Sequence, residues 1–387
     1  MKYDAIIVGA GFSGAVIAER LASQLDYKVL IIEKRNHIAG NCYDYAHTSG
    51  IRVHKYGPHL FHTNNESVWK YLSLFTEWSP YRHKVRGYVD EKYIPIPFNL
   101  KSLALTLPDS YQNLKRLLID TYGYGSRVSI CELLEAKNPE LNKLANFVYE
   151  KVFVGYTVKQ WGVAPEQLSQ EVLKRVPVVI SEEDGYFADK YQAMPIGGYS
   201  SLIESILSHK NIEIELDQDA HSLIEFDVKA RKAKFSQKAG VIIYTGAVDE
   251  LFSFKFGELD YRSLTFKLEE HSQEFYQPAT TVNYPGNEKH TRTTEFKYID
   301  NTSSDSTVIV KEFPQQYKRG VEGRDIPYYP LFDKKNEAIY LDYANHAKQF
   351  DNLFLAGRLA KFKYFNMDEA VQNALETSEQ IIKQATA

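Results

Sequence analysis

The sequence predicts an α/β fold in which a Rossmann-like domain carries two insertions, a helical bundle and an antiparallel β-sheet. Three observations lead to this class. A strand, a glycine turn and a helix open the chain in YDAIIVGAGFSGAVIAERLASQL, residues 3–25. A second strand–turn–helix, NLFLAGRLAKFKYFNMDEAV, occupies residues 352–371. Between them lies a stretch with the apolar spacing of helices, followed by one with the alternation of strands.

Composition excludes several classes of protein. The 387 residues are 44% hydrophobic and 25% charged with a net charge of −4, so no global positive field favours nucleic acid or an anionic membrane. No apolar run approaches the ~20 residues of a membrane span. Met1 leads almost directly into a strand, which predicts no signal peptide. The two cysteines, Cys42 and Cys131, have no metal or redox spacing, so we expect a cytoplasmic protein.

The N-terminal motif is typical of dinucleotide binding. The apolar strand at residues 5–8 precedes Gly9-x-Gly11-x-x-Gly14, and a helix follows. Glycines allow the backbone to turn and to approach a pyrophosphate, which rests on the positive helix N-terminus. Glu33 ends the next strand about 20 residues further on, where a carboxylate holds ribose hydroxyls. Its charge disfavours a 2′-phosphate at the same place.

The residues after Glu33 favour FAD over NAD. Arg35, Gly40 and Asn41 follow it at a spacing that is common in flavoproteins, where a Gly-Asn turn lines the cofactor. The alternative is an ordinary loop that contains asparagine. In a flavoprotein the extended cofactor crosses the sheet, so a distant part of the chain must hold its isoalloxazine end.

The C-terminal segment suits that second task. Residues 353–357 provide a strand and Arg358 a turn, and a helix starts at Asn366 with Glu369 in capping-box position. The positive N-terminus of this helix suits the pyrimidine edge of a reduced flavin. The alternative is a plain C-terminal helix that packs on the sheet. We therefore predict that the two ends of the chain build one FAD site.

The expected domains are discontinuous. Residues 1–82, 194–252 and 335–387 are assigned to the FAD-binding domain. Residues 99–185 are assigned to the helical domain, with a mobile lid at about 166–181. Residues 83–98, 186–193 and 253–334 are assigned to the antiparallel sheet.

Six blocks of sequence resemble the bacterial UDP-galactopyranose mutase family. They are HKYGPHLFHT (54–63), VGYTVKQWG (154–162), MPIGGYSSLIE (194–204), TRTTEFKY (291–298), PYYP (327–330) and AGRLAKFKYFNMD (356–368). They occur in family order, at near-family spacing, from the first strand to the last helix. Asn366 departs from the Asp of many members. Both residues cap helices, so we expect the fold to be unchanged and the flavin potential to differ.

The resemblance implies a flavin-dependent isomerase that converts UDP-galactopyranose to UDP-galactofuranose, for cell-surface glycans that contain galactofuranose. It implies that FAD is active when reduced, and that flavin N5 attacks the anomeric carbon while UDP leaves. The resulting covalent flavin–sugar adduct opens and recloses as the smaller ring, without net redox change. The resemblance also implies a reductant such as NAD(P)H and a homodimer.

The resemblance and the chemistry of the residues together suggest the site. Arg175 and Arg292 offer forked, permanently charged donors to a diphosphate, although either alone also fits a surface ion pair. We expect Arg175, Arg292 and His62 to be catalytic, with His62 beside flavin N5. The expected substrate contacts are Phe153, Tyr156, Thr157, Trp161, Arg175, Tyr186, Asn283, Arg292, Tyr328 and Tyr364. The expected cofactor contacts are Gly9, Gly11, Ser13, Gly14, Glu33, Lys34, Arg35, Gly40, Asn41, His59, Leu60, Gly357, Arg358, Phe365, Asn366, Met367 and Ala370.

Other interpretations stay open at this point. His59 and His62 have the spacing of metal ligands, but no third ligand is evident, so we expect no metal. A flavin amine oxidase or dehydrogenase would share the two-segment FAD fold, with an aromatic cavity for its donor. A mutase for a related nucleotide sugar and a non-catalytic protein that binds nucleotide sugars also fit parts of the pattern.

Overall fold

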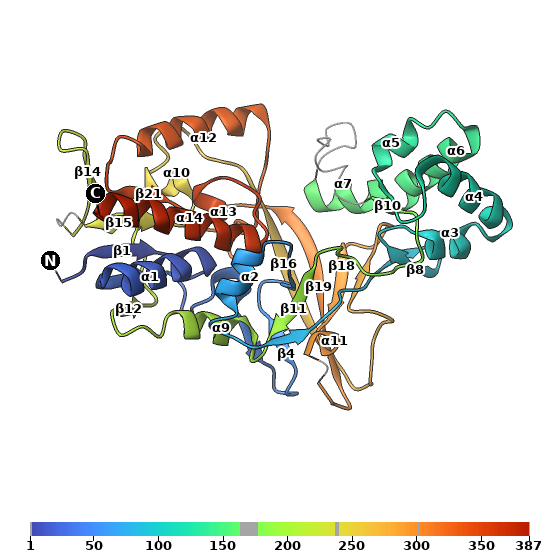
Figure 1. Ribbon diagram of the computed structural model, residues 1–387, viewed down its shortest axis with the longest axis horizontal. Coiled ribbons are helices and arrows are strands. Elements are labelled where there is room, and N and C mark those ends of the chain that lie inside the picture. Colours follow the sequence, from blue (N-terminus) through green and yellow to red (C-terminus); the bar gives the residue numbers. More distant parts are fainter. Residues whose placement is uncertain (1, 163–176, 237–239, 301, 387) are drawn as a thin grey trace.

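A computed structural model describes residues 2–162, 177–236, 240–300 and 302–386 (Figure 1). Arg175 and most of the expected lid lie outside these residues, as does the side chain of Trp161. Figure 1 shows an elongated molecule with a helix-covered sheet at one end, a second sheet in the middle and a group of helices at the other end. Within the described residues, no helix combines the length and apolarity that crossing a bilayer requires.

A five-stranded parallel sheet contains strands from both the N-terminal and the C-terminal segment of the chain. Its strand order is β12–β2–β1–β15–β21. The strands are β1 (Ala5–Val8), β2 (Val29–Ile32), β12 (Ile212–Glu215), β15 (Val241–Tyr244) and β21 (Leu353–Leu355). Ile7 of β1 lies between Ile31 and Ile243 in register. The central strands are apolar on both faces because helices cover both, which confirms the Rossmann-like class.

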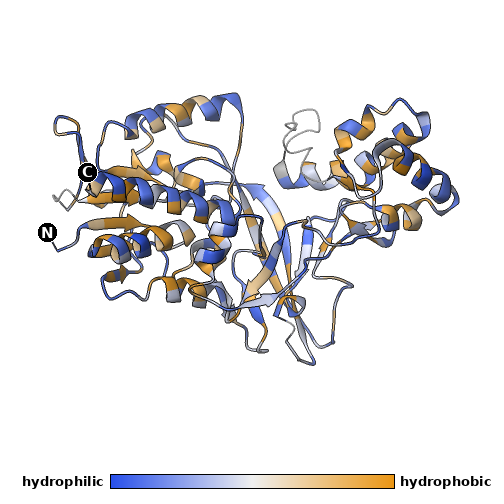
Figure 2. Ribbon diagram, viewed as in Figure 1, coloured by the Kyte–Doolittle hydropathy of each residue, from blue (hydrophilic) through white to orange (hydrophobic). Residues whose placement is uncertain are grey.

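Three helices pack on one face of this sheet and two on the other. Helices α1 (Phe12–Leu25), α9 (Gly198–Ile206) and α14 (Met367–Thr386) share a core with Ala5 and Ile7. Helices α10 (Val248–Leu251) and α12 (Lys334–Ala347) share another with Ile242 and Tyr244, beside the hairpin of β13 (Ile224–Asp227) and β14 (Lys232–Phe235). In Figure 2 apolar colouring dominates the central strands of this first sheet. Helices α12 and α14 carry both colours, as amphipathic helices do.

The second sheet has seven strands, in the order β20–β16–β19–β18–β17–β7–β8. They are β7 (Val85–Val89), β8 (Lys92–Ile96), β16 (Tyr261–His271), β17 (Thr281–Asn283), β18 (Arg292–Glu295), β19 (Thr307–Gln316) and β20 (Tyr329–Pro330). Neighbours are antiparallel except for β17 and β7, which are parallel. The sheet is therefore mixed, not purely antiparallel. These two strands come from distant parts of the chain, so no hairpin imposes an antiparallel pairing on them.

The helical group lies at the far end of the molecule (Figure 1) and packs on strands β7 and β8 of the second sheet. It comprises α3 (Leu100–Thr106), α4 (Tyr111–Tyr122), α5 (Ile130–Leu134), α6 (Pro139–Val148), a π-helical turn at Tyr149–Val154 and α7 (Gly155–Trp161). A two-stranded pair, β9 (Arg127–Val128) and β10 (Val178–Val179), closes it. Its own buried core includes Leu103, Leu118, Leu133 and Leu144.

Short elements join the larger parts. A three-stranded sheet pairs β11 (Tyr191–Pro195) with β5 (Phe61–Thr63) and β6 (Trp78–Pro80). Segment 186–193, which we assigned to the second sheet, thus leads into a strand that pairs with the N-terminal part of the chain. The others are β3 (Asp44–Ala46), β4 (Arg52–His54), α2 (Glu66–Leu72), α11 (Lys297–Asp300) and α13 (Gly357–Ala360), with 3-10 turns at Gly40–Cys42, Pro108–Ser110 and His221–Leu223. The domain limits by residue number stay a prediction.

Gly14→Ala tests the packing of α1 on β1. A Cβ at position 14 would lie 1.9 Å from the carbonyl oxygen of Gly9, which is backbone and cannot rotate away. We expect the variant to lose about 1–3 kcal/mol of unfolding free energy, as overpacked cores do. Denaturant unfolding of the purified protein measures this. Stability equal to that of the unsubstituted protein would contradict the close approach of α1 and β1.

Candidate active site

The first glycine turn brings β1, β15 and α1 close together. Gly9 has a φ of +103°, and a Cβ there would lie 2.1 Å from Thr245 Oγ1, whose hydroxyl donates to the carbonyl of Val8 at 2.7 Å. Helix α1 starts at Phe12, and its N-cap residue is Gly11, which has no side chain to cap it. The N–H groups of its first turn are therefore available to an anion.

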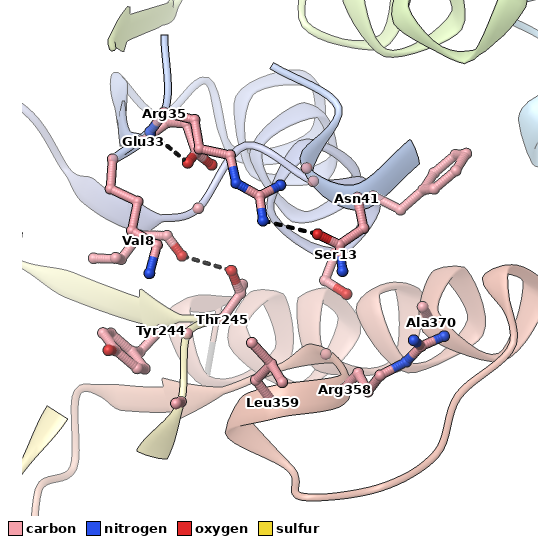
Figure 3. Close-up of a pocket in the computed structure, with 18 of the residues that line it drawn as sticks. Val8, Ser13, Glu33, Arg35, Asn41, Tyr244, Thr245, Arg358, Leu359 and Ala370 are labelled. Carbon is pink, nitrogen blue, oxygen red and sulfur yellow. Dashed lines mark hydrogen bonds between the residues drawn. The ribbon is translucent and has the colours of Figure 1, made fainter. Parts of the chain in front are cut away.

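Glu33 is fixed at the carboxyl end of β2 and is only 6% exposed. Its Oε2 accepts from the backbone N–H of Ala10 and its Oε1 from that of Arg35, both at 2.9 Å. Arg35 in turn donates to Asn41 Oδ1 at 2.8 Å, and its guanidinium lies over the ring of Tyr56 at 4.3 Å. Figure 3 shows Glu33, Arg35 and Asn41 along one wall of a pocket. Each carboxylate oxygen keeps a lone pair for a ribose hydroxyl.

The C-terminal segment forms the facing wall. Gly357 has a φ of +84°, and a Cβ there would lie 2.8 Å from Ser13 Oγ, so only glycine fits beside α1. Arg358 donates from all three nitrogens to the backbone carbonyls of Phe365 and Tyr328, which shapes the turn before α14. Half of the predicted capping box is present, because the N–H of Asn366 donates to Glu369 Oε2 at 2.7 Å.

The pocket between these walls collects most of the expected cofactor residues (Figure 3). Those that line it are Gly9, Gly11, Ser13, Glu33, Lys34, Arg35, Gly40, Asn41, His59, Gly357, Arg358, Phe365, Asn366, Met367 and Ala370. Gly14 does not line it and instead packs under the turn, and Leu60 lines a second, adjoining cavity. Sequence reasoning missed Gln218–His221, Tyr244–Ala247 and Glu250. Most of them follow β12 and β15, and parallel sheets bind ligands at the carboxyl ends of their strands.

The second cavity lies between one face of the second sheet, the turn at residues 56–60 and the turn before α14, and the helical group contributes Tyr156 to it. Seven of the residues expected to be catalytic or to contact substrate line it: His62, Tyr156, Tyr186, Asn283, Arg292, Tyr328 and Tyr364. Phe153 and Thr157 are buried and are not part of its lining. Trp161 and Arg175 lie outside the part of the chain for which side chains are described. The sequence reasoning missed several lining residues, among them Phe187, Glu312 and Tyr329.

Arg292 and Glu312 place a charged pair in this cavity. Arg292 Nε donates to Glu312 Oε1 at 2.6 Å, so this bond leaves both terminal nitrogens of the guanidinium unused. Burial acts to lower the pKa of Arg292, but Glu312 and the tyrosines nearby outweigh it and raise the pKa well above its ordinary value. Among the described residues, Glu312 Oε2 is buried and has no hydrogen-bond partner. A polar ligand in the cavity would satisfy it.

Burial keeps three tyrosines of this cavity protonated. It raises the pKa of Tyr156 and Tyr328 above the ordinary value, and it raises that of Tyr329 to about 12. These side chains therefore keep their O–H groups at every physiological pH. They are suited to donate hydrogen bonds to an anionic ligand.

Burial has the opposite effect on two histidines of the cavity. It lowers the pKa of His59 to about 3, with a further contribution from His54, and that of His83 to about 3, with a contribution from Arg292. Both rings are therefore neutral at physiological pH. His62 differs in its contacts, since its Nδ1 lies 3.1 Å from Asp189 Oδ2.

The two cavities adjoin at one edge. Five residues line both of them: Asn41, His59, Arg358, Asn366 and Met367. A long ligand in the first cavity would therefore present its far end to the second. Within the described residues, no group of three His, Cys, Asp or Glu side chains has the arrangement of a metal site.

Gly11→Ala tests the first cavity without disturbing the fold. A Cβ at Gly11 meets only Gly40 Cα, at an ordinary 3.7 Å, yet it projects between the two backbones that frame the cavity. We expect unfolding of the cofactor-free protein to be unchanged and retention of the expected FAD to fall. The ratio of flavin to protein absorbance measures the latter. Normal flavin content would contradict this placement.

His54→Asn tests the buried histidines through the pH dependence of stability. Burial lowers the pKa of His54 from 6.5 to about 3, so the folded state binds fewer protons than the unfolded state between these values. Stability is therefore full above pH 6.5 and falls as the pH drops toward 3. Asparagine keeps an acceptor for the N–H of His59, which donates to His54 Nδ1 at 2.9 Å. We expect the variant's unfolding free energy to depend less steeply on pH, by up to one proton. An unchanged slope in denaturant unfolding at pH 4–7 would contradict this.

Comparison with known proteins gives a consistent result. Residues 151–364 match the model of the family described as UDP-galactopyranose mutase, and residues 7–75 match that of an NAD(P)-binding Rossmann-like domain. The chain is 37% identical over 385 residues to "Probable UDP-galactopyranose mutase" of Klebsiella pneumoniae, covering 97% of this chain and 94% of that protein. It is 34% identical over 382 residues to dTDP-fucopyranose mutase of Escherichia coli, covering 98% of both.

A solved structure supports the fold. The crystal structure of a reduced UDP-galactopyranose mutase matches with a TM-score of 0.73 at 15% identity, over 100% of this chain and 95% of that one. At that identity the likeness concerns the fold alone. The family model, however, covers more than half of the chain, and the relatives align over nearly its whole length. The chain therefore belongs to the UDP-galactopyranose mutase family.

Proposed function

We propose that this protein is an isomerase that uses reduced FAD to interconvert UDP-galactopyranose and UDP-galactofuranose. The observation that carries the proposal is the shared edge of the two cavities. A dinucleotide groove meets a cavity rich in tyrosine and arginine, and Asn41, His59, Arg358, Asn366 and Met367 line both. This arrangement brings the reactive end of a long cofactor to a nucleotide sugar.

The residues of the first cavity fit FAD. The uncapped start of α1 and the close approach of Gly11 and Gly40 suit a pyrophosphate, and Glu33 suits a ribose. At the other end, the N-terminus of α14 follows directly after Asn366 and faces the shared edge with its positive dipole end. That end suits the electron-rich ring of a reduced flavin. When bound, the reduced flavin supplies the nucleophile that the resemblance implies.

Arg292 would hold the diphosphate. Its terminal nitrogens form a fork that matches phosphate oxygens, and Glu312 fixes the side chain through Nε. In the reaction that we propose, the bond between the anomeric carbon and the diphosphate breaks and negative charge gathers on UDP. A permanently charged donor already in place stabilises that charge.

The tyrosines and neutral histidines would complete the recognition of substrate. Tyr156, Tyr328 and Tyr329 remain O–H donors because burial raises their pKa, so they add neutral donors around the phosphates. His59 and His83 stay uncharged and can accept or donate toward hydroxyls without competing for the phosphates. Arg175, a reductant such as NAD(P)H and a homodimer remain proposals that rest on the family resemblance.

A dTDP-linked deoxy sugar is the second candidate substrate. The dTDP-fucopyranose mutase of Escherichia coli is about as similar to this chain as the Klebsiella relative is. An amine oxidase is a weaker candidate. Arg292 keeps a positive charge in the second cavity, and this charge repels a cationic amine.

Turnover by the reduced protein tests the proposal. Dithionite-reduced protein is incubated with UDP-galactose or with dTDP-fucose, and the nucleotide sugars are separated by chromatography. We expect a furanose product from UDP-galactose and little turnover by the oxidised protein. Product from dTDP-fucose alone would move the assignment to the second candidate. Product from neither would refute both.

Arg292→Lys tests the role of the guanidinium fork. Lysine keeps the positive charge but lacks the planar fork that bonds Glu312 through Nε and presents two parallel N–H groups to a diphosphate. We expect the dissociation constant of UDP, measured by calorimetry, to rise about tenfold or more. Arg86→Lys is the control. Arg86 lies in the same sheet as Arg292 and pairs with Asp184, but it does not line the cavity. Equal affinities for the two variants would show that the fork is not used.

A further inference from the structure

His62 makes a contact that no part of the proposed mechanism uses. It lies on β5 and lines the second cavity, and its Nδ1 lies 3.1 Å from Asp189 Oδ2. Its ring stacks on Phe187, with centroids 3.6 Å apart and planes 18° from parallel. The side chains of His62 and Asp189 are 18% and 22% exposed, so the carboxylate and the imidazole meet largely out of water.

Hydrogen bonds and strand pairing hold Asp189 in place. Its Oδ1 accepts from Asn64 Nδ2 at 3.1 Å, and Asn64 Oδ1 accepts from the backbone N–H of Lys190 at 2.9 Å. Strand β11 starts two residues after Asp189 and pairs with β5, with Gln192 opposite His62. The carboxylate is therefore fixed beside His62 by side chains and by the strand pairing.

A carboxylate accepts hydrogen bonds and cannot donate them when it is ionised. Nδ1 of His62 must then carry the proton that it shares with Asp189. In the neutral ring this leaves Nε2 without a proton, on the side of the imidazole away from the carboxylate. Nε2 is thus the nitrogen that remains for a ligand in the second cavity.

We propose that Asp189 is a positioning residue that holds His62 in the Nδ1–H tautomer and so presents Nε2 to the cavity as a hydrogen-bond acceptor. The significance of this for turnover rests on the proposed function. An acceptor there can take the proton of a sugar hydroxyl. The O–H bond breaks as the oxygen of that hydroxyl forms the C–O bond that closes the sugar ring. The carboxylate also stabilises the imidazolium that forms when Nε2 takes up that proton, as in hydrolytic triads.

The experiment reads the tautomer directly. Protein labelled with 15N at its histidines is studied by NMR at a pH where His62 is neutral, and His62→Asn assigns the signal by its loss. We expect Nδ1–H in the unsubstituted protein. Asp189→Ala should move His62 toward Nε2–H, because no carboxylate is then left to accept from Nδ1.

Two controls separate positioning from general support of the fold. Asp184→Ala removes a carboxylate of the same segment that pairs with Lys84 and Arg86 and makes no contact with His62. Asn64→Ala removes the other partner of Asp189 and leaves the bond to His62. Neither should change the tautomer. A ring that is Nε2–H in the unsubstituted protein, or one unaffected by Asp189→Ala, would overturn the proposal.

Turnover supplies the second readout. With reduced protein and UDP-galactose, Asp189→Ala should lower kcat about tenfold or more with little change in KM. An altered tautomer with unchanged kcat would remove the catalytic part of the proposal. If the unsubstituted protein turns over no nucleotide sugar, the proposed function fails, while the NMR result still decides whether Asp189 controls His62.

Discussion

The structure depends on the close approach of backbones at three glycines. Gly14 allows α1 to touch the end of β1, Gly11 faces Gly40 across the groove, and Gly357 sits against Ser13. A Cβ at Gly14 would come within 3 Å of the Gly9 carbonyl, and one at Gly357 within 3 Å of Ser13 Oγ. The glycine at 14 therefore lets α1 lie close to β1, and the glycine at 357 lets the C-terminal turn lie close to α1. The groove between the segments follows from this constraint, and so does the position of α14 at its far end.

The second cavity contains an interaction that fold stability does not explain. Glu312 is fully buried and Arg292 is 26% exposed, so pairing them removes much of the water from both charges. Buried ion pairs are often no better for stability than apolar residues of similar volume. Here one carboxylate oxygen also lacks a partner among the described residues. The pair makes sense if a ligand completes it. An anion would take the terminal nitrogens of Arg292, and a hydroxyl would donate to Glu312.

Sequence motifs predicted the residues of the cofactor groove better than those of the substrate cavity. Gly9, Glu33 and Asn366 were recognisable because local motifs determine their positions: a glycine turn, the end of a strand and the start of a helix. Glu312 and Tyr329 were not, because the pairing of β18 with β19, and of β16 with both β19 and β20, brings these distant segments together around Arg292. The parallel pair of β7 and β17 was missed for the same reason, since strand periodicity fixes which face is buried but not which strand is the neighbour.

The charges of the two cavities suggest how one site handles two ligands. Arg358 also lines both cavities, but its three nitrogens already donate to backbone carbonyls, so it adds positive potential and few free donors. Arg292 has donors to spare. With His59 and His83 neutral, the charged side chains of the second cavity lining are Arg292, Arg358 and Glu312, apart from whatever charge His62 carries. The positive excess then lies where a diphosphate would enter, and the neutral rings are left for the sugar. A cavity organised in this way separates the group that leaves from the group that rearranges, as the proposed isomerisation requires.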